Sequence, residues 1–315
     1  MRTKYLLLEQ QEQKQQHEED FLTAMTRLAA IARPSPVLLT FTNAGQADFI
    51  KSFLCNLGQV GGAAMQRRLV VVVPDRRTRS SLAAFSPEVT LVLRPWAGEQ
   101  GHLRFGTGQY MDFIEYRTQA VLEVVQAGLQ VVLVDADHYW TRDPVPWIGE
   151  QQGYDIITEN AHFEPLQFVC GGFLYLNSTP ATQQLWSKVT QQTKFFRSFP
   201  ETSSVNEQDV MTRILPEITR GGRRRGGGRA ESLWATADLL YPPPAAISWR
   251  FLPSDRFAPG RWYFPEHAKE RRRPVWSVHN NWVVGNVVKI ERARRFGHWF
   301  YNETCDCCLN NVVLG

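Results

Sequence analysis

Short runs of β-forming apolar residues alternate with segments of helical periodicity through the first half of the chain. Continuous apolar runs of this kind are typical of strands that are buried on both faces of a parallel sheet. Their alternation with helices predicts an α/β fold with a doubly wound, mostly parallel sheet. The expected strands are 37–43, 68–75, 89–95 and 131–134, and the expected helices are 47–57, 78–85 and 111–127, the last ending at Gly128.

The pattern changes after Pro146, where apolar strands and helices no longer follow one another in strict alternation. We expect further strands at 154–160 and 168–178, and helices at 182–196 and 206–215. The last hundred residues carry scattered aromatic residues and prolines with little periodicity. That part is therefore predicted to be irregular, with mostly strands and loops.

Two aspartates follow the fourth expected strand, whose apolar run begins at Val131 and leads directly into Asp135 and Asp137. In open α/β sheets, ligands bind just outside the carboxyl ends of the strands. Alternation along an extended chain would point both carboxylates to the same side. Two oxygen ligands on one side suit Mg²⁺ or Mn²⁺, and such an ion suits a diphosphate. Alternatively, both residues are ordinary turn or helix-capping aspartates.

Three further features of the sequence indicate a functional site more strongly in combination than singly. The pair Gly171-Gly172 interrupts an apolar strand, which indicates a close approach of a ligand, or else a bulge or a packed helix. The polar cluster 206–209 opens a helix and is compatible with capping. His279 follows a short apolar run and can complete a metal shell, while Lys289 can meet a phosphate. Taken singly, each of these two is more often a structural or a solvated residue.

The formal net charge of +4 in 315 residues comes largely from two basic runs, 220–229 and 271–273. Neither run is interleaved with aromatic residues, so no nucleic-acid partner is expected, and the first run reads as a looped insertion. We find no apolar run long enough to span a membrane.

The chain has five cysteines, of which three lie in the cluster 305–308. That cluster lacks the paired spacing of a zinc site but can contribute to a disulfide in an oxidising compartment. Asn177 and Asn302 each begin an N-glycosylation triplet, which points weakly to the secretory pathway.

Five segments give the chain a family likeness. They are AGLQVVLVDADHYWTRDP, YDIITEN, CGGFLYLNS, NEQDVMTRIL and VHNNWVVGNVVKIERARRFGHW. In this order and spacing, over about residues 35–300, the chain resembles nucleotide-diphospho-sugar transferases of the glycosyltransferase family 77 type. The resemblance implies a GT-A fold, with one Rossmann-like sheet and an irregular C-terminal region on the acceptor side. It also implies an enzyme, a metal-dependent, retaining glycosyltransferase that moves a hexosyl or pentosyl group from a UDP-sugar to a glycan or glycoprotein acceptor.

The resemblance also implies roles for individual residues. Asp135, Asp137 and His279 would hold Mn²⁺, or Mg²⁺ in its place. Gln208 and Asp209 would lie near the transferred sugar or the acceptor, as the catalytic residues. The remaining donor-binding residues would be Ala136 between the two aspartates, Arg117, Gly171 and Gly172 in the sugar pocket, and Gly285 and Lys289 at the departing phosphate.

The same likeness divides the chain into a stem-like helical segment at 1–33, a catalytic domain at 34–300 and a cysteine-containing tail at 301–315. It implies the Golgi lumen as the location, behind a type II membrane anchor that this chain does not show.

Other readings of the sequence stay open. In a phosphatase of the haloacid dehalogenase type, Asp135 would be the nucleophile and Asp137 the general acid, although that motif normally opens its domain. A GT-A-like module that binds nucleotide sugars without turnover would keep the same residues. Binding of RNA through the run 220–229 would be salt-dependent. The sequence does not select the donor sugar, the acceptor or the oligomeric state.

Overall fold

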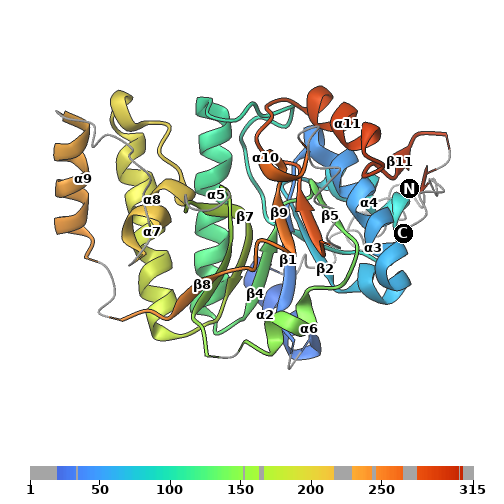
Figure 1. Ribbon diagram of the computed structural model, residues 1–315, viewed down its shortest axis with the longest axis horizontal. Coiled ribbons are helices and arrows are strands. Elements are labelled where there is room, and N and C mark those ends of the chain that lie inside the picture. Colours follow the sequence, from blue (N-terminus) through green and yellow to red (C-terminus); the bar gives the residue numbers. More distant parts are fainter. Residues whose placement is uncertain are drawn as a thin grey trace, which may run out of the picture.

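A seven-stranded sheet in the order β3-β2-β1-β4-β7-β6-β8 runs through the middle of the molecule, between two sets of helices (Figure 1). The computed structural model describes residues 20–32, 35–151, 153–162, 167–215, 229–242, 246–264, 275–304 and 306–307. The first four strands are β1 (Val37–Phe41), β2 (Leu69–Val73), β3 (Thr90–Leu93) and β4 (Val131–Val134). They pair in parallel, as the alternation of strands and helices predicted.

The other half of the sheet contains one reversed strand. β7 (Val169–Leu176) is antiparallel to both of its neighbours, β4 and β6 (Ile156–Asn160). The edge strand β8 (Trp249–Phe251) is again parallel to β6. The sheet is therefore mixed but mostly parallel and flanked by helices, which confirms the expected fold class.

Both faces of the central strands are buried, which explains why these strands read as unbroken apolar runs. Leu38 of β1 and Val132 of β4 belong to one core cluster, together with side chains of α3 (Ala47–Arg67) and α4 (Arg76–Phe85). Leu39 and Leu133 belong to the opposite cluster, with α2 (Phe21–Ala32), α5 (Gly108–Gln126), α7 (Pro180–Arg197) and α8 (Glu207–Ile214).

The helix ends follow local capping chemistry. Asp75 accepts a hydrogen bond from the Thr78 backbone N–H at the start of α4, at 2.8 Å. Gly128, with φ of 86°, follows the end of α5, as expected for a glycine after a helix. The expected helix 47–57 proves too short, because α3 continues past a kink at Gly61 and Gly62 to Arg67.

The C-terminal region contains more helix than expected, alongside the predicted short strands and loops. Its helices are α9 (Arg229–Leu240), α10 (Gly260–Tyr263) and α11 (Asn286–Arg295). In α11 only Ala293 is buried, so the sequence shows no apolar stripe of helical period. The remaining short helices are η1 (Ala44–Gln46), α6 (Val145–Gly149) and η2 (Pro200–Thr202).

A second, three-stranded sheet was not expected from the sequence. It places β10 (Ser277–His279) between β5 (His138–Trp140) and β9 (Phe257–Pro259). β10 is antiparallel to β5, so that His279 lies directly opposite His138. This pairing brings a segment from the end of the chain beside the two aspartates.

Both ends of the described chain are attached to the main fold, one by packing and the other by a disulfide. In α2, Met25 is fully buried against the core. The hairpin of β11 (Tyr301–Asn302) and β12 (Asp306–Cys307) is joined to α3 by a disulfide between Cys55 and Cys307. Cys170 is buried and free, whereas Cys305, Cys308 and most of the basic runs 220–229 and 271–273 lie outside the described residues.

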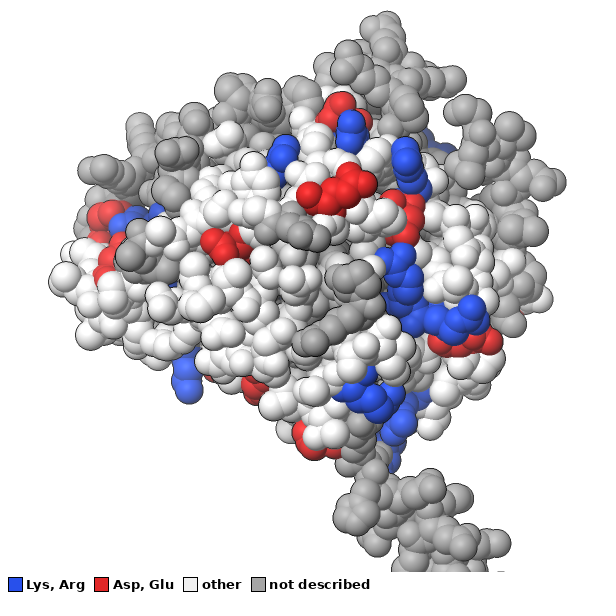
Figure 2. Space-filling model, turned by 90° about the horizontal axis from the view of Figure 1, so that it is seen from below, with Lys and Arg blue, Asp and Glu red and all other residues white. Residues whose placement is uncertain are grey.

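On the face seen in Figure 2, acidic side chains lie among the basic ones and most of the surface is uncharged. Within the described ranges, no helix combines the length and the apolar character needed to cross a bilayer.

Opening the disulfide should destabilise the protein. It links residues 252 positions apart, so we expect Cys55→Ser to lower the free energy of unfolding by about 2–5 kcal/mol. Chemical unfolding under oxidising conditions measures this loss. The native protein in a thiol reductant is the control and should unfold like the variant. Equal stability of the oxidised native protein and the variant would contradict the prediction.

Candidate active site

Asp135 and Asp137 lie at the carboxyl end of β4, where ligands of such sheets bind. The backbone turns here, because the His138 N–H donates to the Asp135 carbonyl at 3.2 Å. The Asp135 N–H donates to the Gly172 carbonyl of β7 at 2.8 Å. The expected geometric reason, alternation along an extended chain, is therefore wrong. Instead, this turn places both carboxylates near the same side chain.

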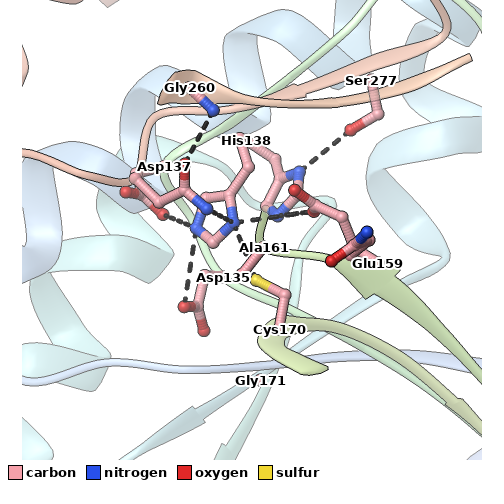
Figure 3. A network of polar contacts seen from close by, with 12 residues as sticks. Asp135, Asp137, His138, Glu159, Ala161, Cys170, Gly171, Gly260 and Ser277 are labelled. Atoms are coloured by element: carbon pink, nitrogen blue, oxygen red, sulfur yellow. Dashed lines mark hydrogen bonds and ion pairs between the residues drawn. The ribbon is translucent and has the colours of Figure 1, made fainter. Parts of the chain in front are cut away.

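That side chain is the imidazole of His279, which lies on β10. Its Nε2 lies 3.3 Å from Asp137 Oδ1 and 3.9 Å from Asp135 Oδ2. Figure 3 shows Asp135 and Asp137 in one network of polar contacts with Cys170 and Glu159 nearby. The candidate ligand atoms of the three residues lie within 4.8 Å of one another. Two carboxylates and one imidazole suit Mn²⁺ or Mg²⁺ and leave coordination positions open for diphosphate oxygens.

Lys289 of α11 also reaches this centre. Its ammonium donates to Asp137 Oδ2 at 2.6 Å. Gly285 precedes the helix with a φ of 103°, a conformation that favours glycine. The Asn286 side chain donates to the Gly45 carbonyl at 2.8 Å, just beyond the carboxyl end of β1. The first turn of α11 therefore lies between the Asp137 region and the end of β1.

Arg117 of α5 approaches the aspartates from within the protein. It is only 7% exposed, and its Nη1 donates to Asp135 Oδ1 at 2.7 Å. Its Nη2 donates to Glu207 at 2.5 Å and to the Gly171 carbonyl at 3.4 Å. Burial raises the pKa of Glu207, although the Arg117 guanidinium opposes this shift. Arg117 therefore links the Asp135 carboxylate to the start of α8.

The polar residues at the start of α8 make two different kinds of contact. The Gln208 side chain accepts a hydrogen bond from the Gly171 N–H at 2.8 Å, so it lies beside the glycine pair. The Asp209 side chain accepts from the Asn206 N–H at 3.2 Å and completes a capping box. The structure therefore gives Asp209 a capping role, while its predicted role near the sugar stays a prediction.

Gly171 and Gly172 lie in a bulge of β7, and their lack of side chains leaves room for the side chains of His279 and Glu207. Thr158 of β6 pairs with Leu174, but the next residue, Glu159, pairs with Cys170. A Cβ on Gly172 would lie 2.2 Å from His279 Cε1. A Cβ on Gly171 would lie 2.5 Å from a carboxylate oxygen of the Glu207 side chain.

Ala136 differs from its neighbours. Its side chain packs against an apolar cluster of Phe49, Ala293 and Trp299. Its expected place in donor binding stays a prediction.

The charges of this centre are strongly coupled. Burial acts to raise the pKa of Asp137, but Lys289 and His279 hold it well below its usual range. Burial acts to lower the pKa of His279, but Cys170, Asp137 and Glu159 raise it well above the usual value. Without a metal, a proton on the imidazole therefore faces the carboxylates. A divalent cation would take the place of that proton.

The sequence profile of the nucleotide-diphospho-sugar transferase family matches residues 64–293, which is more than half of the chain. The chain belongs to this family. The match confirms the predicted class of enzyme, a glycosyltransferase that uses nucleotide sugars. It also outweighs the phosphatase reading of the sequence.

Similar members of the family occur in Arabidopsis thaliana. A β-arabinofuranosyltransferase is 22% identical over 87% of this chain and 49% of its own length. A UDP-D-xylose:L-fucose α-1,3-D-xylosyltransferase is 19% identical over 87% of this chain and 72% of its own length. This chain thus spans about half the length of the first relative.

Two solved structures of glycosyltransferases align with most of this chain. The glycosyltransferase GlyE of Streptococcus pneumoniae has a TM-score of 0.44 and 12% identity, over 82% of this chain and 60% of that one. Mouse xyloside xylosyltransferase 1 has a TM-score of 0.45 and 11% identity, over 81% of this chain and 98% of that one.

The structure thus brings most predicted site residues to one place and adds others that the sequence did not single out. The added residues are Glu207, Glu159, Cys170 and His138. Only Glu207 had a local signal, as an acid at a helix start, and that signal equally fits capping.

The close approach at Gly172 can be tested by filling it. We expect Gly172→Ala to lower the free energy of unfolding by about 1–3 kcal/mol, because the new methyl group would overlap the His279 ring. Urea unfolding measures the change. Gly149→Ala in α6, where a Cβ meets nothing within 4 Å, is the matched control and should be neutral or stabilising. A neutral Gly172→Ala would show that the imidazole has room to move.

Proposed function

We propose that this protein transfers a sugar from a UDP-sugar to a glycan or glycoprotein acceptor with the help of Mn²⁺. The observation that carries this proposal is the convergence of Asp135, Asp137 and His279 at the carboxyl end of β4. Family membership supplies the class of donor. Mg²⁺ has the same preference for oxygen ligands and is the alternative ion.

The surroundings of the site suit a diphosphate leaving group. The start of α11 has no side-chain cap, so its first N–H groups and the positive end of its dipole are available to an anion. Lys289 adds a positive charge from the same helix. When bound, the metal would stabilise the negative charge that grows on the departing phosphate. The lysine and the helix terminus would hold the diphosphate in place.

The sugar would lie on the other side of the aspartates, between the bulge of β7 and the start of α8. Gly171, Gly172 and Gln208 line that region, and Arg117 fixes the Asp135 carboxylate behind it. We propose a pentose or hexose donor, since the similar plant enzymes are named for xylose and arabinofuranose. We further propose that the anomeric configuration is retained.

The disulfide supports a location in the secretory pathway, with the Golgi lumen as the proposed compartment. Disulfides persist in oxidising compartments and are rare in the cytosol, and the Cys55–Cys307 bond joins distant parts of the fold. The glycosylation triplet at Asn302 lies in the exposed hairpin that this bond holds.

Removing the two carboxylates should abolish catalysis. We expect Asp135→Asn with Asp137→Asn to lower Mn²⁺-dependent release of UDP by about 10²- to 10³-fold, because the charge on the leaving group loses its support. The assay uses UDP-xylose, UDP-arabinofuranose and UDP-galactose, with and without a panel of glycan acceptors. Asp112→Asn on the surface of α5 is the control. Unchanged UDP release by the double variant would refute the metal site.

The same assay separates the rival functions. A binding module would bind the nucleotide sugar without releasing UDP on any acceptor. A phosphatase would release phosphate from p-nitrophenyl phosphate.

Lys289 should affect turnover and metal binding in opposite ways. Its ammonium occupies Asp137 Oδ2 at 2.6 Å, so Lys289→Met frees that oxygen for the metal. We expect Mn²⁺ affinity to stay the same or rise, while turnover falls by about 10²-fold because the leaving phosphate loses a cation. Isothermal titration with Mn²⁺ and UDP release measure the two effects. Lys51→Met, which removes another lysine that pairs with an aspartate, Asp48, is the control. A parallel loss of both properties would contradict the assigned role.

A further inference from the structure

The imidazole of His279 has a second side that the proposed function does not use. Its Nδ1 lies beside the buried side chains of Glu159 and Cys170, whereas its Nε2 lies beside the aspartates. Glu159 Oε2 lies 3.6 Å from this nitrogen and Cys170 Sγ lies 3.2 Å from it. The side chain of Asn281 is the third neighbour, with its Nδ2 at 3.2 Å.

A bulge in the central sheet creates this cluster. The shift of register between Thr158 and Glu159 leaves residues 171–173 without a partner on β6 and sets Glu159 opposite Cys170. Bulges of this kind re-aim side chains and are common next to active sites. Glu159 is 1% exposed, and a carboxylate so deeply buried is costly unless it is paired. The fold therefore buries an acid behind the candidate metal ligand at a cost in stability.

The chemistry of the three neighbours decides which ring nitrogen carries the proton. A neutral imidazole that binds a metal through Nε2 must carry its proton on Nδ1, and that proton needs an acceptor. Asn281 presents its NH₂ group there, because its Oδ1 already accepts from the Gly260 N–H at 2.7 Å. Cys170 is a weak acceptor. Glu159 is thus the one strong acceptor among these neighbours.

We propose that Glu159 is a positioning residue that holds His279 with its proton on Nδ1 and its Nε2 free for the metal. The inference rests on the proposed metal site and extends it to a partner behind the ligand. A carboxylate behind a metal-bound histidine fixes the ring and raises its basicity. Asn281 favours the opposite tautomer, so the balance at Nδ1 depends on Glu159.

His138 fits the same arrangement. Its Nδ1 bonds the Ser277 hydroxyl at 2.9 Å, and its Nε2 lies 3.7 Å from Glu159 Oε2. Its ring stacks on His279 with centroids 4.2 Å apart and an interplanar angle of 20°. Lone pairs of nearly parallel rings do not converge on one point, so this geometry disfavours a second metal between the imidazoles. It suits a carboxylate that lies across the edges of both rings.

The test measures metal affinity apart from activity. Titration of the metal-free protein with Mn²⁺, followed by the electron paramagnetic resonance signal of the free ion, gives the dissociation constant directly. We expect Glu159→Leu to weaken Mn²⁺ binding by about 10- to 100-fold, and Glu159→Gln to weaken it less because its carbonyl still accepts a hydrogen bond. The thermal unfolding temperature of both metal-free variants should be unchanged or higher, because a buried acid has been removed.

Cys170→Ala is the matched control, since it removes another neighbour of the same nitrogen. We expect it to change Mn²⁺ affinity by less than about threefold, because a thiol is a weak acceptor. Equal losses in Cys170→Ala and Glu159→Leu would mean that packing, not the carboxylate, holds the ring. That result would overturn the inference.

The remaining outcomes separate the inference from the proposed function. If Asp135→Asn with Asp137→Asn abolishes Mn²⁺ binding while Glu159→Leu and Glu159→Gln leave it intact, the metal site stands and the positioning role fails. If the aspartate variant binds Mn²⁺ like the native protein, the proposed metal site itself fails. A lower unfolding temperature of the metal-free Glu159→Gln variant with unchanged affinity would also overturn the inference, by showing a purely structural role.

Discussion

The contact between the His279 ring and the backbone of Gly172 is the constraint on which the rest of the site depends. Any side chain at position 172 would overlap the ring, so β7 can only pass the imidazole at a glycine. The same backbone accepts the N–H of Asp135 and fixes the start of the turn. One glycine therefore sets the distance between the histidine and the first aspartate, and the register of β10 against β5 sets the rest.

Around this contact, most carboxylates of the site form an ion pair with an arginine or a lysine. Asp135 and Glu207 share Arg117, and Asp137 has Lys289. Among the described residues, the partners of Glu159 in ion pairs are the two imidazoles, which are charged only when protonated. The acids thus outnumber the permanent cations, and the shortage of positive charge lies at His279. A divalent ion between the aspartates would supply it.

The sequence predicted what depends on local pattern. Parallel strands β1 to β4, the end of α5 at Gly128 and the aspartates beyond Val134 all follow from periodicity and position along the chain. The small sheet of β5, β9 and β10 could not be predicted, because its strands are three residues long and β5 pairs with β10 across more than a hundred positions. Glu159 was read only as part of a strand, since its role depends on a bulge in another strand.

The reversed direction of β7 explains why the glycines can serve the aspartates at all. Because β7 is antiparallel to β4, its beginning lies at the carboxyl end of β4, where Val134 pairs with Phe173. Gly171 and Gly172 immediately precede this pair, so the bulge meets the turn that carries Asp135. In a parallel strand, the same glycines would lie at the amino end of β4, far from the ligand edge of the sheet. The one departure from a parallel sheet in this half of the fold is thus what assembles the site.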